Sequence, residues 1–412
     1  MTSTTRSKAP IILWSVVTLY FAFQFILRLI PGILREDIMQ TFMVDDVSFG
    51  QLAGFYYLGY SGMQLPMGYM LDRYNTKYIV SLSIILAAIG TFIFSFASNW
   101  QFLLFGRFLI GAGSAVAFLS VAKVTALYFP KEKQSSMIGL SFTIGLTGGV
   151  MGGAPTRMLI DSYGFTNSLN LLGVFALICA SLVFLSFSLK TQDEGTKQEP
   201  KITLNETLKI IFSPKILYIG ICGGLMVGSL EGFTDVWAIA YFEHIYKFSH
   251  LDSISATSIV YIGMCFGGAI LGFCADRFKS TIPMILIIGA INCTIFGIFF
   301  SLSSPSYYFV ASIMFLLGIL CCYQVLVFGI ATKTVSAESA GITIAVINCI
   351  NTSFGYLFHV LISSVIQANW KGQLSDNGVP VYDLNAYLIA LSPVPILCML
   401  GAAGFLYFYK SK

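Results

Sequence analysis

Charge is scarce in this sequence. Only 10% of its 412 residues are Asp, Glu, Lys or Arg, whereas soluble domains carry about 25% charged residues. The hydrophobic share is 56% and the mean hydropathy is +0.81. Many apolar stretches reach the roughly 20 residues that a membrane-spanning helix needs. A soluble globular protein is therefore excluded, although length alone would allow two or three soluble domains, and an integral membrane protein is predicted.

The motifs of several enzyme classes are also missing. The sequence has no Gly-x-x-x-x-Gly-Lys-[Ser/Thr] loop, so an ATP-driven pump is not expected. It has neither His-Glu-x-x-His nor the paired-aspartate motif that an intramembrane enzyme would need. The nine cysteines are scattered without metal-ligand spacing, and a disulfide framework is not expected. We therefore predict that the protein is not an enzyme and has no cofactor, metal or nucleic-acid partner.

Twelve apolar runs organise the chain. They predict an all-α membrane protein of about twelve transmembrane helices in two pseudo-symmetric six-helix bundles. The N-terminal bundle is expected at 1–189, a charged linker with a short surface helix at Leu204–Ile211 fills 190–214, and the C-terminal bundle occupies 215–412. The runs fall at about 11–34, 47–71, 78–98, 101–127, 137–159, 167–189, 215–242, 254–275, 282–302, 306–331, 340–366 and 385–409.

The basic residues predict the orientation. If the N-terminus lies inside, about sixteen Lys and Arg residues fall in the termini, the linker and the loops on its side, against four in the opposite loops. Positively charged loops stay cytoplasmic, so both termini and the linker are expected in the cytoplasm. The first run is too long for a signal-peptide core and has no small-residue cleavage site, which predicts an uncleaved first helix. The short loops fit a multi-pass protein of a bacterial inner membrane, with the membrane of a eukaryotic organelle as the alternative.

A short polar hinge occurs twice. Gly68-x-x-x-Asp72-Arg73 separates the second and third apolar runs, and Gly272-x-x-x-Asp276-Arg277 follows about 204 residues later at the same place in the hydropathy pattern. One copy would be weak evidence, but two copies half a chain apart indicate two homologous halves.

The hinge resembles the loop between helices 2 and 3 of the major facilitator superfamily, which reads Gly-x-Leu-Ala-Asp-Arg-x-Gly-Arg-Lys. This chain keeps Lys77 and has Asn75 where Gly is usual; Asn tolerates a left-handed turn, so we expect it to replace Gly. Arg107 and Gly111 match the Arg-x-x-x-Gly signature of the family's helix 4. The spacing of the antiporter motif on helix 5 is present without its Pro, at Gly145, Gly149 and Gly153.

This resemblance covers the whole chain and implies a carrier that works by alternating access. Within the superfamily, the stretch 106–133 is similar to lysosomal dipeptide carriers, and the region around Arg28 is similar to bacterial organic-anion and organophosphate carriers. The resemblance also places the first helix along the central cavity.

Three polar residues share one face of that helix. Tyr20, Gln24 and Arg28 recur every four residues. Arg28 is a candidate for binding a carboxylate or phosphate of the substrate, with the other two as hydrogen-bond partners. Alternatively, the long Arg28 side chain extends to the membrane interface.

Two acids occupy the matching region of the seventh helix. Subtracting the repeat offset from Glu231 and Asp235 places them beside Arg28, and helices 1 and 7 are symmetry mates in such folds. We predict that one acid pairs with Arg28 or the substrate and exchanges a proton, because burial raises the pKa of a carboxyl group. The alternative is a structural ion pair that closes the outer gate.

Further polar residues in the spans are candidates for the same cavity. On helix 11, Asn348 and Asn351 could bind substrate and His359 could relay protons, or they could join helices by hydrogen bonds. Gln324 on helix 10 is another candidate for substrate binding. Arg107 could bind substrate, or it could pair with a backbone group of helix 1 or 2.

The hinge residues are expected to act as a cytoplasmic gate. Their charge pairs would hold the two halves together on the inside and break when that side opens. The gate comprises Gly68, Asp72, Arg73, Lys77, Gly272, Asp276 and Arg277.

Together these features predict a monomeric secondary transporter that is coupled to protons. Its partners would be protons, membrane lipid and a small polar molecule: an amino acid, a dipeptide or a small organic anion. Two alternatives stay open, a membrane sensor with a carrier fold that does not transport, and an exporter of drugs or sugars.

Overall fold

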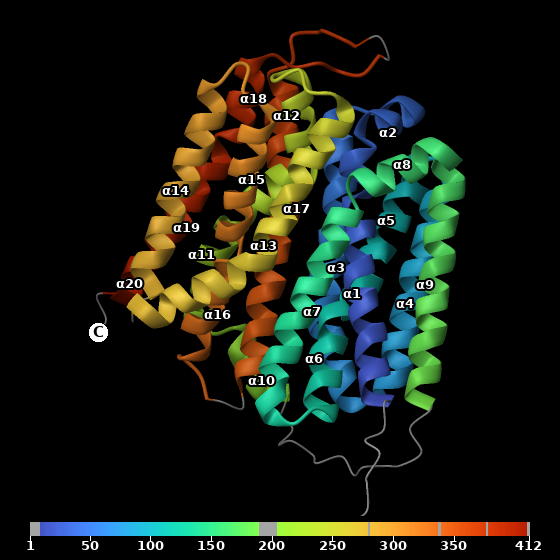
Figure 1. Ribbon diagram of the computed structural model, residues 1–412, viewed down its shortest axis with the longest axis vertical. Coiled ribbons are helices and arrows are strands. Elements are labelled where there is room, and N and C mark those ends of the chain that lie inside the picture. The colour runs from blue at the N-terminus through green and yellow to red at the C-terminus, as the bar shows by residue number, and fades with distance from the viewer. Residues whose placement is uncertain (1–8, 189–203, 279–280, 337–338, 376–377, 410–412) are drawn as a thin grey trace, which may run out of the picture.

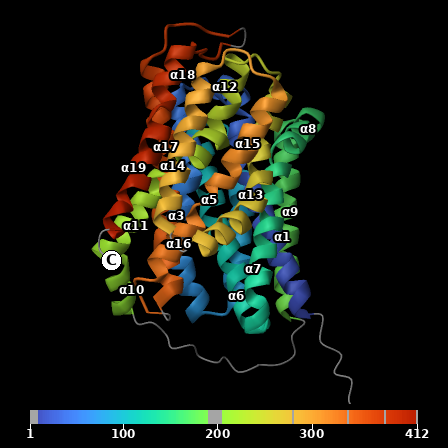
Figure 2. The same cartoon turned by 60° about the vertical axis from the view of Figure 1, so that its left-hand side comes forward.

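The computed structural model describes residues 9–188, 204–278, 281–336, 339–375 and 378–409. Of the described residues, 87% are helical, and the long helices run side by side along the longest axis (Figures 1 and 2). Helices from the first half of the sequence lie together on one side in Figure 1, and those from the second half lie on the other. The predicted all-α fold is confirmed.

The N-terminal helices alternate in direction along the long axis. Several spans are made of two helices in succession, because the α-helical hydrogen bonding is interrupted within them. The helices are α1 (Ala9–Ile33), α2 (Arg35–Phe42), α3 (Asp46–Arg73), α4 (Thr76–Ser95), α5 (Trp100–Ser114), α6 (Val116–Tyr128), α7 (Lys131–Met151), α8 (Ala154–Tyr163) and α9 (Phe165–Ser188).

The C-terminal helices follow the short α10, whose position matches the surface helix predicted in the linker. The α-helices are α10 (Leu204–Ile211), α11 (Pro214–Leu225), α12 (Ala238–His244), α13 (His250–Phe278), α14 (Thr281–Ser301), α15 (Tyr307–Cys321), α16 (Gln324–Thr332), α17 (Ala340–Ala368), α18 (Leu384–Leu391), α19 (Pro393–Gly404) and α20 (Leu406–Tyr409). Between α11 and α12 lie a 3-10 helix, η1 (Val227–Ser229), and a π-helix, η2 (Leu230–Trp237).

Ten helical stretches of the described chain are long and apolar enough to cross a membrane, or eleven when α7 and α8, which meet at a bend of 43°, count as one. Helix α3 has 28 residues but is less apolar, because many of its residues are Gly, Tyr, Gln or Ser. It packs between α5 and α17 inside the protein, where a strongly apolar surface is not needed. With α3 included, the spans number the expected twelve.

The hinge between α3 and α4 forms by helix capping. The Asn75 side chain accepts a hydrogen bond from the Lys77 backbone N–H at 3.0 Å and so caps the start of α4. Its φ of −65° and ψ of 114° are extended. The expectation that Asn75 replaces Gly in a left-handed turn is therefore wrong: Asn suits this position because its oxygen satisfies a free backbone donor.

The two ends of the molecule differ. Helix α1 begins, α9 ends and α10 lies at the lower end in Figure 1, which we call the linker end; α2, α8 and α18 lie at the opposite end. The N-terminal and C-terminal helices meet mainly where α3 packs against α17 and α7 against α13, and α1 also contacts η2. These contacts bring Arg28 to the acids of the seventh span.

Candidate functional site

A buried ion pair lies between the N-terminal and C-terminal helices. Arg28 on α1 donates from Nε to Asp235 Oδ2 at 2.8 Å, and its Nη2 lies 2.7 Å from the same oxygen. Glu231 Oε1 lies 3.8 Å from Nη2. The side chains of Arg28, Glu231 and Asp235 are only 10%, 4% and 3% exposed. Arg28 therefore faces two acids at the same depth, as the repeat offset predicted.

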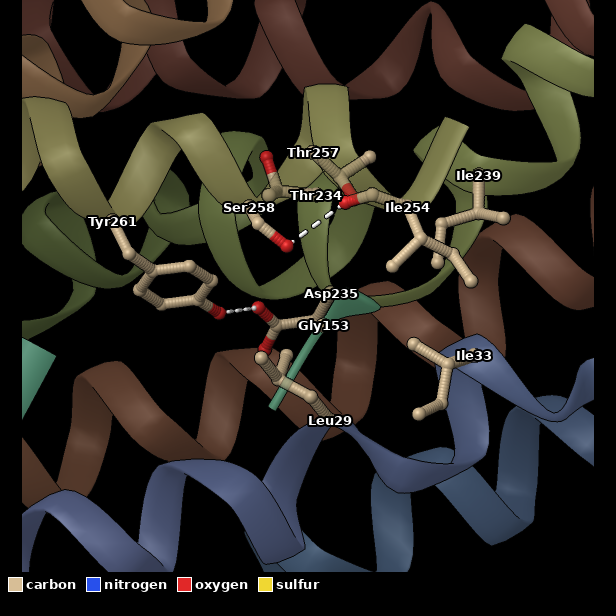
Figure 3. Close-up of a pocket in the computed structure, with 10 residues that line it drawn as sticks. All are labelled: Leu29, Ile33, Gly153, Thr234, Asp235, Ile239, Ile254, Thr257, Ser258 and Tyr261. Atoms are coloured by element: carbon tan, nitrogen blue, oxygen red, sulfur yellow. Dashed lines mark hydrogen bonds between the residues drawn. The ribbon is translucent and has the colours of Figure 1, made fainter. Parts of the chain in front are cut away.

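Two tyrosines complete the surroundings of Asp235. Tyr57 on α3 donates its hydroxyl to Oδ2, and Tyr261 on α13 donates to Oδ1 at 2.7 Å (Figure 3). One carboxylate thus joins α1, α3, η2 and α13. Neither tyrosine was among the predicted site residues. Each is a hydroxyl-bearing residue inside an apolar run, and such a signal is too common among the 21 tyrosines of the chain to single them out.

The acids lie on a π-helix rather than on a regular α-helix. Glu231 and Asp235 both belong to η2, which follows the 3-10 turn η1. The hydroxyl of Thr234 donates to the carbonyl oxygen of Ser229 at 2.8 Å and satisfies one acceptor in this irregular stretch. Wider helical turns of this kind occur mostly as short segments and are frequent at functional sites. The assumption of α-helical spacing does not hold here.

A small cavity adjoins Asp235 on the side that faces α2, α8 and α18. It lies between α1, η2, α12 and α13, and Figure 3 shows the Asp235 carboxylate and the Tyr261 hydroxyl meeting beside it. Its polar lining includes Thr257 and Ser258, whose hydroxyls both donate to the carbonyl oxygen of Ile254 at 2.8 Å. These lining hydroxyls are therefore already engaged.

The remaining candidates on α1 point into the N-terminal helices. Gln24 Oε1 accepts a hydrogen bond from the Tyr56 hydroxyl at 2.5 Å. The Tyr20 hydroxyl donates to the carbonyl oxygen of Gly113 on α5 at 3.1 Å, and Tyr20 is fully buried. Both contacts hold α1 against its neighbours, and their predicted roles in binding remain predictions.

Arg107 supports the backbone that carries Arg28. Its Nη1 donates to the carbonyl oxygen of Leu27 at 2.6 Å, and its Nη2 donates to that of Arg28 at 2.5 Å. The guanidinium also lies over the Tyr56 ring, 4.8 Å from its centroid. These contacts match the backbone-pairing alternative, and they make Arg107 a positioning residue for the ion pair.

Helix α17 lines the other side of Glu231. Asn351 and His359 are buried there, whereas Asn348 is partly exposed. The His359 ring lies 5.4 Å from the Tyr57 ring. Gln324, at the start of α16, is partly exposed. The structure therefore brings His359 beside Tyr57, whose hydroxyl binds Asp235, whereas Asn351 Oδ1 lies close to Gly223 of α11.

The hinge residues make their described contacts within the N-terminal helices. Asp72 Oδ1 lies 2.7 Å from Lys123 Nζ, Arg73 lies over the Tyr69 ring at 4.8 Å, and Lys77 Nζ donates to Ser188 Oγ at 2.7 Å. The second copy of the hinge contributes less. Arg277 is exposed, and the side chain of Asp276 lies outside the described residues. At the glycine of either copy, Gly68 or Gly272, no described atom of a neighbouring element lies within 4 Å of the position that a Cβ atom would take.

At the opposite end, by contrast, the two sets of helices are joined. A side chain at Gly32 of α1 would overlap the carbonyl oxygen of Asp235. Arg35 and Asp46 form a buried ion pair, and the Tyr382 hydroxyl, from the C-terminal half, donates to Asp46 Oδ2 at 2.5 Å. The Arg35 guanidinium also lies over the ring of the buried Trp237, at 5.6 Å. This arrangement is closed at the opposite end.

Among the described residues, no group of three or more His, Cys, Asp or Glu side chains is placed to hold a metal ion. The chemistry of the site is that of charge recognition. It consists of one buried cation, two carboxylates and several hydroxyl and amide groups, placed where the two sets of helices meet.

This arrangement of paired helical sets around a buried polar centre defines a multi-pass membrane protein of the carrier class. The family model of the Major Facilitator Superfamily matches residues 16–358. The chain belongs to this superfamily, and membership supports a carrier rather than an enzyme.

Individual relatives are distant. The chain is 24% identical to an uncharacterized transporter, YybO, of Bacillus subtilis (strain 168) over 277 residues, 61% of either protein. It is 26% identical to a probable galactarate/D-glucarate transporter, GudP, of the same strain, over 54% of this chain and 48% of that protein. The matches thus span about half to three fifths of these relatives. Bacterial relatives are consistent with the predicted inner-membrane location.

Solved structures share the fold over almost the whole chain. A bacterial homologue of the human lysosomal transporter Spinster, in an inward-facing and occupied conformation, superposes with a TM-score of 0.79. The alignment covers 98% of both chains at 16% identity. At this identity the likeness concerns the fold alone.

Proposed function

We propose that this protein is a secondary transporter that moves a small carboxylate-bearing metabolite by alternating access and couples its movement to protons. One observation carries the proposal: Arg28 is a buried cation whose partner is the carboxylate of Asp235, and a substrate carboxylate of similar geometry would be able to take that place. An isolated buried charge is costly, so a charged partner at this position must be exchanged for another rather than simply lost.

The proton follows from this exchange. When a substrate carboxylate takes the place of Asp235 on Arg28, the released carboxylate stays in a largely apolar interior, where its neutral form is favoured. The hydroxyls of Tyr57 and Tyr261 remain beside it. Uptake of one proton by Asp235 would balance the incoming negative charge and couple the two movements.

The contacts at the two ends support alternating access. The opposite end is joined, and the hinge residues at the linker end bond only within their own half among the described contacts, so substrate would reach Arg28 from the linker end. We place this end in the cytoplasm, following the distribution of basic residues. In the alternative state the two bundles, 1–189 and 215–412, would move relative to each other. The two hinges would then close the linker end, and the Arg35–Asp46 network at the opposite end would open.

The relatives support an anionic group on the substrate. GudP is named for two sugar acids, galactarate and glucarate. A neutral sugar or a lipophilic drug has no carboxylate that could replace Asp235 beside Arg28. An exporter of drugs or sugars is therefore less well supported.

Flux into proteoliposomes tests the proposal. We expect an inward proton gradient to drive accumulation of at least one compound from a panel of amino acids, organic acids and sugar acids. Arg28→Met should abolish it. Arg157→Met should not, because Arg157 pairs with Asp37 and Asp161 at the opposite end, with side chains 18%, 52% and 54% exposed. Wild-type flux in Arg28→Met would refute the assignment, and ligand binding without any flux would favour the sensor.

A further inference from the structure

Several buried polar atoms beside the ion pair lack a partner. Glu231 Oε2, both amide atoms of Asn351 and His359 Nδ1 have no hydrogen-bond partner within the described ranges. The three residues are 3%, 0% and 1% exposed. Leaving such atoms unpaired is costly, and folded proteins contain few of them. Four such atoms, on η2 and on successive turns of the facing helix α17, suggest a site whose missing partner is a ligand.

Gly355 allows Glu231 to approach α17 closely. A Cβ atom added there would lie 2.6 Å from Glu231 Oε2 and 2.7 Å from a ring carbon of Tyr57. Glu231 therefore reaches into the gap that the missing side chain leaves on α17. Asn351 and His359 lie one helical turn before and after Gly355 and so share its face. Asn351 Oδ1 also lies close to Gly223 of α11.

We propose that Glu231 and Asn351 form a subsite for the ammonium group of an amino acid whose carboxylate binds Arg28; this rests on the function proposed above. An ammonium group has three donors and no acceptor. It can satisfy Glu231 Oε2 and Asn351 Oδ1 together, and in one tautomer also His359 Nδ1. A hydroxyl group has one donor and would leave at least one of these acceptors unpaired.

The spacing favours a short substrate. Arg28 Nη2, which would hold the carboxylate, lies 3.8 Å from Glu231 Oε1. The positions for a negative and a positive group are therefore neighbours. An α-amino acid carries both groups on one carbon atom, whereas a peptide bond separates them in a dipeptide. The subsite thus selects α-amino acids among the carboxylates that Arg28 could accept.

Ligands that share a carbon skeleton and differ in one substituent show how much the ammonium group contributes to binding. We would measure dissociation constants of the full-length purified protein by calorimetry for propionate, lactate and alanine, and for 3-phenylpropionate, 3-phenyllactate and phenylalanine. A charge-assisted contact predicts that the amino acid of a set binds at least about tenfold more tightly than the other two. In Glu231→Gln and Asn351→Leu this ratio should fall to about one.

Two control variants carry the same substitutions elsewhere. Glu243 contacts His250, and the buried Asn292 accepts a hydrogen bond from Ser229 at 2.8 Å; Glu243→Gln and Asn292→Leu should keep the ratio. The melting temperatures of all variants without ligand show which of them fold. If one of the two site variants fails to fold, the ligand ratio measured for the other one tests the subsite. Equal affinity within each set in wild type, or a ratio that survives in both site variants, would overturn the subsite but leave the role of Arg28 intact. Failure of every carboxylate to bind would overturn the proposed function itself.

Discussion

Removing the charge of Asp235 should destabilise the protein more than the loss of one ordinary contact. In Asp235→Asn, Arg28 stays buried, and among the described residues Glu231, at 3.8 Å, is the acid that remains near it. Breaking a buried pair by removing one partner costs about 3–5 kcal/mol. Because Glu231 can replace part of the interaction, we expect the lower end of that range, about 3 kcal/mol.

A double-mutant cycle separates the pair from the individual side chains. Arg28→Met removes the cation and keeps an apolar side chain of similar length, so the double variant with Asp235→Asn contains no unpaired charge from this pair. We expect it to be more stable than the sum of the single effects predicts, with a coupling free energy of at least about 2 kcal/mol. Denaturant titration in detergent micelles, followed by circular dichroism, measures the free energies of unfolding.

An exposed pair provides the control for this cycle. Lys371 Nζ lies 2.6 Å from Asp383 Oδ2, with side chains 65% and 38% exposed. Such pairs contribute about 0.2–1 kcal/mol, so Lys371→Met with Asp383→Asn should show weak coupling. The reasoning would be refuted by equal coupling in the two cycles, because burial would then not determine the strength of the central pair.

Three further results are expected. Gly355→Ala should weaken ligand binding by displacing Glu231, while Gly268→Ala, where no atom lies within 4 Å of the added Cβ, should not; calorimetry compares the two. Asp72→Asn should change the unfolding free energy by less than about 1 kcal/mol, because its pair with Lys123 is exposed. The same substitution should slow proteoliposome flux if the hinge closes the linker end in the other state. His244, with Nε2 3.7 Å from Glu36 Oε1, lowers the pKa of Glu36; this stabilisation is present above the ordinary carboxyl pKa of about 4.3 and is lost as pH falls through the lowered value. The melting-temperature difference between wild type and Glu36→Gln should therefore shrink on acidification, and a difference that grows would contradict this sign.

Much of the architecture could be predicted because hydropathy is a local property. A run of about 20 apolar residues must form a span wherever it lies in the chain, which identified eleven of the spans and the more polar α3. The duplicated hinge and the residues on α10 were likewise readable from short stretches. The offset between the repeats even placed Arg28 at the level of Asp235, because duplicated halves keep corresponding residues at corresponding depths.

The helices, the family and the few charged residues that a membrane interior must accommodate could be read from the amino-acid pattern. Which of these groups contact one another depends on the packing of the helices. Tyr57 and Tyr261 come from different halves, and their approach to Asp235 depends on how α3 and α13 are rotated, which periodicity does not specify. The π-helix that carries both acids and the gap at Gly355 that admits Glu231 arise from packing between helices. The physical reason is one of range: burial in lipid acts on each segment separately, whereas a binding site requires contacts between segments about 200 residues apart.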